Sequence, residues 1–180
     1  MDFEHYLNLH KSGNLIEAEK GYRILLKKRK INPNIFTSLG LICNQTGREN
    51  ESVDFFKKAV DANPYDELAL NNLGLIFFKN KKHKKAKIFF TQTVEIQPNY
   101  ALAFVSLATV NAELKEYEKA VSNYQKAIEI QPNHSYANSN LLFNICWSNN
   151  NKVYLIIQSF FIKIYSLKFP SLSLMQSVLL

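Results

Sequence analysis

The fold is decided by a short motif that occurs three times: DANP at residues 61–64, EIQP at 95–98 and EIQP at 129–132. The three prolines that end these motifs lie 34 residues apart, and a fixed period of this length is typical of helical repeat architectures. With each proline at position 32, three complete units cover residues 33–66, 67–100 and 101–134. We therefore expect stacked repeats rather than one mixed core.

Several other positions agree in side-chain size across the three units. Position 8 is always small: Gly40, Gly74 and Ala108. Position 20 is small as well: Ser52, Ala86 and Ala120. Position 24 is always aromatic: Phe56, Phe90 and Tyr124. Small residues recur where two helices approach closely, and large apolar residues recur where a gap must be filled.

This pattern resembles the tetratricopeptide repeat (TPR), a 34-residue helix-turn-helix unit. The resemblance implies an all-α chain, stacked as a right-handed α-solenoid whose first helices line a concave surface. An earlier unit at about 1–32 is expected to have a longer second helix that continues through Lys27 to Lys30. A further first helix is expected at 135–147, so the solenoid would cover residues 1–147.

Composition agrees with a helical chain. The protein has 180 residues, of which 47% are hydrophobic, and only 5 Gly and 5 Pro. These are too few for a many-stranded sandwich or for glycine-rich phosphate loops. Cys43 and Cys146 lie too far apart in sequence to indicate a disulfide framework, and Asp2 and Glu4 precede no early apolar run. We expect a cytoplasmic protein.

The resemblance also indicates which side chains face the groove, because positions 2, 5, 6, 9, 12 and 13 of the first helix do so in the family. The expected peptide-binding residues are Ser38, Leu41, Asn71, Asn72, Leu75, Phe78, Val105, Ser106, Thr109 and Asn140. The Lys, Asn and Arg residues with which some TPR modules grip an acidic chaperone terminus are missing from the corresponding positions. The sequence therefore argues against such a clamp.

Position 6 carries polar side chains in a row: Ser38, Asn72, Ser106 and Asn140. An asparagine amide can donate and accept hydrogen bonds, so a row of them can hold a peptide backbone. The row resembles the asparagine ladder of O-linked N-acetylglucosamine transferases, with serine on alternate rungs. The alternative is that asparagine is simply abundant in this chain.

A second resemblance lies in NHSYANSNLLFNI at 133–145. This segment is similar to the junction of bacterial O-linked N-acetylglucosamine transferase-like proteins, where the last repeat leads into the transferase domain. On that interpretation the chain is the substrate-selecting TPR arm of a truncated enzyme. The alternative is that the segment is another first helix.

The composition changes in the tail. We expect a linker at 148–151 and an atypical apolar tail at 152–180, in which VYLIIQSFFIKIYSL at 153–167 forms an apolar helix. These 15 residues are fewer than the roughly 20 that span a bilayer. The tail could pack on the last repeat, pair with a second copy or contact a membrane surface. From Asn138 onward Val153 and Val178 are the only residues encoded by codons beginning with G, so the tail could also be a frameshifted reading.

The net charge is +7, and ten of the 22 basic residues lie in two runs, 27–30 and 79–87. Both are expected at helix ends, as solvated turns rather than as a nucleic-acid patch, because aromatic residues for base stacking are not interleaved with them. Lys81 and Lys115 replace the turn glycine of the repeat. A left-handed backbone there would cost about 1 kcal/mol.

Catalytic and metal-binding patterns are not recognisable. His5, His10, His83 and His134 are scattered, and neither cysteine has a nearby base in the sequence. We expect no catalytic residues, cofactor, metal ion or small-molecule substrate, and nucleic-acid binding is disfavoured. The predicted function is a protein-protein interaction scaffold that binds an extended peptide or partner helix. The transferase arm is the alternative.

Overall fold

The structure is a computed structural model, and it describes residues 2–28 and 32–148. That part of the chain forms nine α-helices and no strands. The helices are α1 (Phe3–Lys11), α2 (Leu15–Lys27), α3 (Pro33–Gln45), α4 (Glu49–Ala62), α5 (Glu67–Lys79), α6 (His83–Ile96), α7 (Ala101–Glu113), α8 (Tyr117–Ile130) and α9 (Ser135–Ser148).

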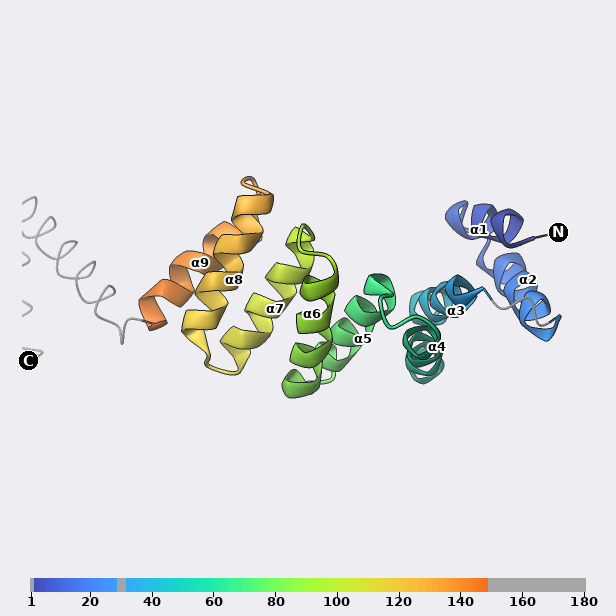
Figure 1. Cartoon of the computed structure of the whole chain (residues 1–180), viewed down its shortest axis with the longest axis horizontal. Helices are drawn as coiled ribbons and strands as arrows, with labels where there is room; N and C mark the ends of the chain where they lie inside the picture. The colour runs from blue at the N-terminus through green and yellow to red at the C-terminus, as the bar shows by residue number, and fades with distance from the viewer. Residues whose placement is uncertain (1, 29–31, 149–180) are drawn as a thin grey trace, which may run out of the picture.

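The helices follow one another along the long axis of the molecule, with α1 and α2 at one end and α9 at the other (Figure 1). Each helix packs mainly on its neighbours in sequence. This is the arrangement of a solenoid, in which one helix pair covers the apolar face of the next. The all-α repeat architecture expected from the sequence is confirmed.

Local signals explain where several helices begin. The Asp66 carboxylate caps α5 by accepting a hydrogen bond from the Ala69 backbone N–H at 2.9 Å. The Asn32 side chain caps α3 in the same way, and Pro33 occupies the first turn of that helix. Both arrangements satisfy or avoid the unpaired N–H groups that every helix start leaves.

Within each unit, the two helices meet where position 8 lies against the ring at position 24. A Cβ added to Gly40 would lie 2.7 Å from the Phe56 ring, and one added to Gly74 would lie 2.5 Å from the Phe90 ring. Ala108 and Tyr124 are buried together in the corresponding cluster of α7 and α8. The missing side chain therefore makes room for the ring.

The first unit uses the same complementarity in reverse. Tyr6 occupies position 8 of α1, and the residue facing it is Gly21 of α2. A Cβ on Gly21 would overlap the Tyr6 ring. In this unit the ring is on the first helix and the glycine on the second, so the two helices still pack closely.

The turns inside the units require a left-handed backbone. Gly13 and Gly47 have φ of 83° and 78°, while Lys81 and Lys115 adopt φ of 58° and 61° at the equivalent position. Residues with a side chain rarely adopt this conformation, because their Cβ atom approaches the neighbouring backbone oxygen. The left-handed backbone considered for Lys81 and Lys115 is therefore present, and the lower stability expected of these turns stays a prediction.

Two helix boundaries differ from those expected. The second helix of the first unit ends at Lys27, with Lys28 as its cap, and the rest of its expected extension, 29–30, lies outside the described residues. Asn32, which directly precedes Pro33, has an extended backbone, as a proline favours for the residue before it. At the other end, α9 includes Ser148, which was expected to begin the linker.

The described helices contain no segment long and apolar enough to cross a membrane. The remainder of the expected linker after Ser148 and the apolar tail at 152–180 lie outside the described residues. The expected apolar helix at 153–167 therefore stays a prediction.

We predict that Gly74→Ala destabilises the protein by about 1–3 kcal/mol, although alanine favours helices more than glycine does, because the new methyl group would overlap the Phe90 ring. Urea unfolding followed by circular dichroism would measure this change. The double variant Gly74→Ala/Phe90→Leu should be less destabilised than the sum of the two single variants. Additive effects would contradict the packing explanation.

We also predict that Lys81→Gly and Lys115→Gly each raise the free energy of unfolding by about 0.5–1 kcal/mol, because glycine relieves the positive φ. The matched control is Lys57→Gly, an exposed lysine in the middle of α4. That change should lower stability by about 1 kcal/mol. Thermal unfolding of the three variants would distinguish relief of turn strain from a general effect of removing lysine.

Candidate functional site

The first helices of the units form a concave surface with two hollows. One hollow lies among α1, α3 and α5, and the other lies among α5, α7 and α9. The described chain offers these two sites on the groove side, and the chemistry of their walls differs.

The hollow among α5, α7 and α9 is apolar and has a volume of about 370 Å³. Leu75, Leu102 and Tyr136 are 44%, 48% and 49% exposed at this site, whereas Phe90 and Val105 are buried in its wall. The residues that line it are Leu75, Phe78, Phe90, Leu102, Val105, Ser106, Thr109, His134 and Tyr136. Five of the ten predicted groove residues are therefore brought together here.

The hollow among α1, α3 and α5 is larger, with a volume of about 620 Å³, and its wall mixes apolar and polar groups. It contains two predicted residues, Ser38 and Leu41. The other lining residues are Phe3, Leu7, His10, Lys11, Asn34, Thr37, Gln45, Asn63, Asp66, Glu67 and Leu68. Burial lowers the pKa of His10, and a hydrogen bond with Gln45 partly opposes this.

Asp66 joins α3 to α5 at the wall of this larger hollow. One carboxylate oxygen caps α5, and the other accepts a hydrogen bond from the Thr37 hydroxyl. Both side chains are buried. The sequence signal for the cap was available, since Asp66 directly precedes a helix, but its bond to Thr37 depends on how the units stack.

The polar row at position 6 is mostly engaged with its own helices. The Asn72 amide donates to the Leu68 carbonyl at 2.8 Å, the Ser106 hydroxyl to Leu102 at 3.0 Å and the Asn140 amide to Tyr136 at 2.9 Å. Asn72 and Ser38 are only 9% and 6% exposed. A bound peptide would therefore meet Ser106 and Asn140 more readily than the other two.

Two more predicted residues are tied into the helix packing. Asn71 is 4% exposed, and its Oδ1 atom has no hydrogen-bond partner among the described residues. The Thr109 hydroxyl lies 2.8 Å from the Val105 carbonyl oxygen, to which it can donate, and 3.0 Å from the Tyr124 hydroxyl, with which it shares a hydrogen bond. Burial raises the pKa of Tyr124 to about 12.

Sequence reasoning missed an ion-pair network at the junction of the first two units. Arg48 contacts Glu19 at 2.6 Å and Glu51 at 3.1 Å, and Arg23 pairs with the same two carboxylates. The network ties α2 to α4 across a junction where α2 and α3 touch less than the corresponding helices of later units. Its members come from separate units, so a linear pattern does not reveal them.

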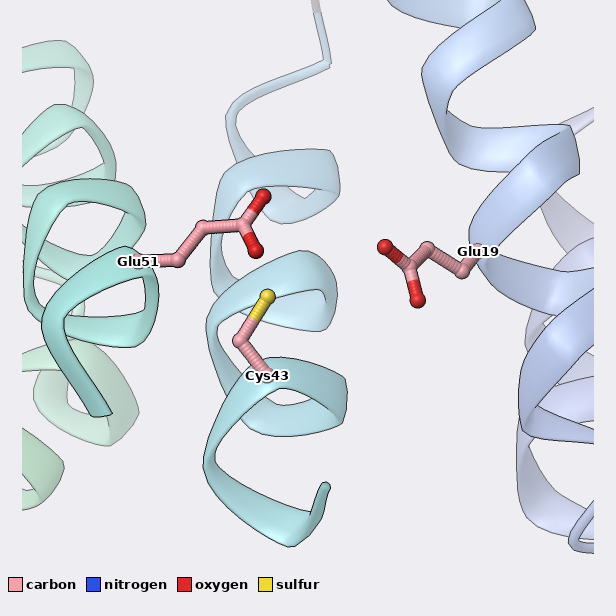
Figure 2. Close-up of side chains that lie close together, drawn as sticks. All are labelled: Glu19, Cys43 and Glu51. Atoms are coloured by element: carbon pink, nitrogen blue, oxygen red, sulfur yellow. The ribbon is translucent and has the colours of Figure 1, made fainter. Parts of the chain in front are cut away.

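Cys43 lies between the two glutamates, and all three side chains point toward one another from α3, α2 and α4 (Figure 2). Their Sγ and carboxylate oxygen atoms lie within 4.8 Å of one another, a spacing that a metal ion could use. However, both carboxylates are already paired with arginines, and burial raises the pKa of Cys43 to about 11. We interpret the set as an ion-pair network beside a buried thiol.

The basic run at 79–87 lies at the turn between α5 and α6, outside both hollows. Lys79 pairs with Glu49 at 2.9 Å, and Lys87 pairs with Glu116. Lys85 lies 5.7 Å above the Phe77 ring. Part of the positive charge is thus used in contacts between units.

Comparison with known proteins identifies the repeats. Family models described as tetratricopeptide repeat match residues 33–66 and 65–133, which together make up more than half of the chain. No curated protein matches the chain by sequence. The comparisons give no support to the resemblance of 133–145 to a transferase junction, and in the structure residues 135–145 form most of α9, the first helix of a further unit.

Several solved structures share the fold. MamA from Desulfovibrio magneticus RS-1 is 20% identical, with a TM-score of 0.72 over 93% of each chain. YrrB, described as a TPR protein with an unusual peptide-binding site, is 24% identical, with a TM-score of 0.63 over 73% of this chain and 68% of its own. The first TPR of Spaghetti (RPAP3), bound to the HSP90 peptide SRMEEVD, is 23% identical, with a TM-score of 0.59 over 62% of this chain and 89% of its own.

We predict that Glu19→Gln lowers stability at neutral pH and loses this effect in acid. The hydrogen bonds from Arg48 lower the pKa of Glu19 from 4.5 to about 2. A carboxylate with a lowered folded-state pKa stabilises the fold above its unfolded pKa, and this contribution is lost as the pH falls from about 4.5 toward 2. Urea unfolding of both proteins across this range would test it, with Glu17→Gln, an exposed residue of α2, as the control.

Proposed function

Because the chain belongs to the tetratricopeptide repeat family, we propose that it is a protein-interaction module that binds an extended peptide in its concave groove. An α-solenoid offers a long open surface rather than a deep cleft prepared for chemistry. We further propose that the module is not itself catalytic and that it acts in the cytoplasm.

One observation carries the proposal: the apolar hollow among α5, α7 and α9. Leu75, Leu102 and Tyr136 leave roughly half of their surface exposed around a volume of about 370 Å³. Covering apolar surface gains roughly 25 cal/mol per Å². A large aliphatic or aromatic side chain of a bound peptide would therefore contribute the most binding free energy at this site.

The polar groups of the groove suit the backbone of such a peptide. Asn140 and Ser106 lie at the same register position of adjacent first helices, and each retains acceptor capacity after donating to its own helix. They can accept hydrogen bonds from peptide N–H groups on both sides of an apolar anchor residue. Backbone contacts of this kind tolerate many peptide sequences, so the anchor would supply most of the selectivity.

The charges of the groove indicate what the peptide is not. Lys79 and Glu113 occupy position 13 of neighbouring first helices with opposite signs, and Lys11 and Glu67 mix signs at the larger hollow. The RPAP3 domain holds an acidic peptide. Here Leu41 and Leu75 occupy position 9, so we propose an uncharged, apolar segment as the ligand instead.

The test is selection of a random peptide display library on the full chain, followed by titration of the enriched peptides by isothermal calorimetry. We expect the enriched peptides to share a large apolar residue. Leu75→Asp and Leu102→Asp, which change exposed groove side chains, should weaken binding at least tenfold, about 1.4 kcal/mol.

The matched control is Ile88→Asp, which places the same charge on a 58% exposed position of α6 outside both groove hollows. It should leave affinity unchanged. Circular dichroism would confirm that the three variants are folded. If the selected peptides bind the groove variants and the control equally well, the groove is not the binding surface and the proposal fails.

A further inference from the structure

The last helix of the described chain leaves a large apolar surface uncovered. On α9, Leu142 is 68% exposed, Phe143 58% and Trp147 45%. Trp147 stacks on Tyr117 of α8 with ring centroids 5.9 Å apart, and Phe143 lies 6.0 Å from the same indole ring. These three residues are here called the α9 face, and α9 itself lies at the end of the described helices opposite the N-terminus (Figure 1).

At one of these three positions each earlier first helix is covered by the second helix of its own unit, whereas Phe143 and Trp147 stand at positions 9 and 13, which in α5 are the exposed Leu75 and Lys79. Leu142 stands at position 8, where Gly40, Gly74 and Ala108 are all buried. Exposed apolar surface of this kind marks a contact site, because a solenoid needs a polar outer face at its ends.

We propose that residues 153–167 of the same chain cover the α9 face. This segment, VYLIIQSFFIKIYSL, contains a single charged residue, Lys163, and needs an apolar partner of its own. It follows α9 after only four residues, 149–152, a connection close in length to the three-residue turns within the units. The face that lacks a cover and the segment that lacks a partner are thus directly joined.

The short connection decides between this occupant and a second copy of the chain. A tether of a few residues holds the segment at an effective concentration in the millimolar range. A second copy must instead give up its translational and rotational freedom when it binds. At ordinary protein concentrations the tethered segment therefore occupies the face first.

The contact must differ from the packing inside the other units. Those units place a small residue at position 8 or, in the first unit, at Gly21 opposite Tyr6. Here Leu142 would face a segment without any Gly or Ala. We therefore expect large side chains on both sides, with the segment held farther from α9 than a regular second helix would be.

Trp147 is the only tryptophan of the chain and lies on the α9 face, so its fluorescence reports directly on the cover. In the full chain we expect blue-shifted emission and poor quenching by acrylamide, both unchanged on dilution. Ile157→Asp/Phe161→Asp should shift the emission to the red and raise quenching toward that of N-acetyltryptophanamide. The control is Gln158→Asp/Ser159→Asp, which adds the same charge without removing apolar side chains. It should cause a smaller red shift and a smaller rise in quenching.

A second measurement uses α9 itself. Leu142→Ser should lower the midpoint of thermal unfolding of the full chain. If residues 153–167 cover Leu142, the substitution removes an apolar side chain from a buried contact. Ile16→Ser is the matched control, since Ile16 of α2 is 67% exposed, against 68% for Leu142. That variant should unfold at the parent temperature.

Four outcomes would overturn the proposal. Trp147 that is freely quenched in the full chain, or Leu142→Ser and Ile16→Ser with equal effects, would show that the face is bare. Protection that disappears on dilution, together with a halved mass in light scattering, would assign the face to a second copy. Protection that appears only with phosphatidylcholine–phosphatidylserine vesicles would assign it to a membrane surface.

Discussion

The structure depends on one steric relation, in which a residue with little or no side chain on one helix of a unit lies against an aromatic ring on the other. Gly40 with Phe56 and Gly74 with Phe90 show it in its usual direction, and Tyr6 with Gly21 shows it reversed. Close-packed interiors tolerate neither a void nor an extra methyl group at such a contact. This relation sets the distance between the two helices of each pair and thereby the shape that the stacked pairs can take.

The groove is a consequence of that stacking. Because first helices follow one another on the concave side, different register positions of neighbouring units come together there, and Leu75 at position 9 of its unit and Leu102 at position 2 of the next line one hollow. The same stacking buries neighbouring positions, so Asn71 and Asn72 contribute more to packing than to an open surface. The groove is therefore less polar than the row of serine and asparagine residues at position 6 indicates.

The two ends of the solenoid differ in how their helices are held: the first units are joined by an ion pair, and the last helix leaves apolar side chains exposed. At the N-terminal end, α2 and α3 share a sparse contact, and the charges of Glu19 and Arg48 reinforce it from outside the apolar core. Both side chains retain part of their exposure, so solvent screens the pair and keeps its contribution to the free energy of folding modest. At the other end, α9 packs one side on α8, and Leu142 on another side of the helix is exposed.

The sequence alone determined the repeat period, the helix pairs, the small and aromatic packing positions and the turns at Lys81 and Lys115, because these features depend on contacts within one unit that recur in each copy. Only the tertiary structure decided which of the ten predicted groove residues remain open, that Thr37 bonds Asp66, and that residues as distant as Glu19 and Arg48 pair. Those outcomes depend on the rotation between successive units. That rotation results from all the packing contacts between units together, and no short stretch of sequence encodes it.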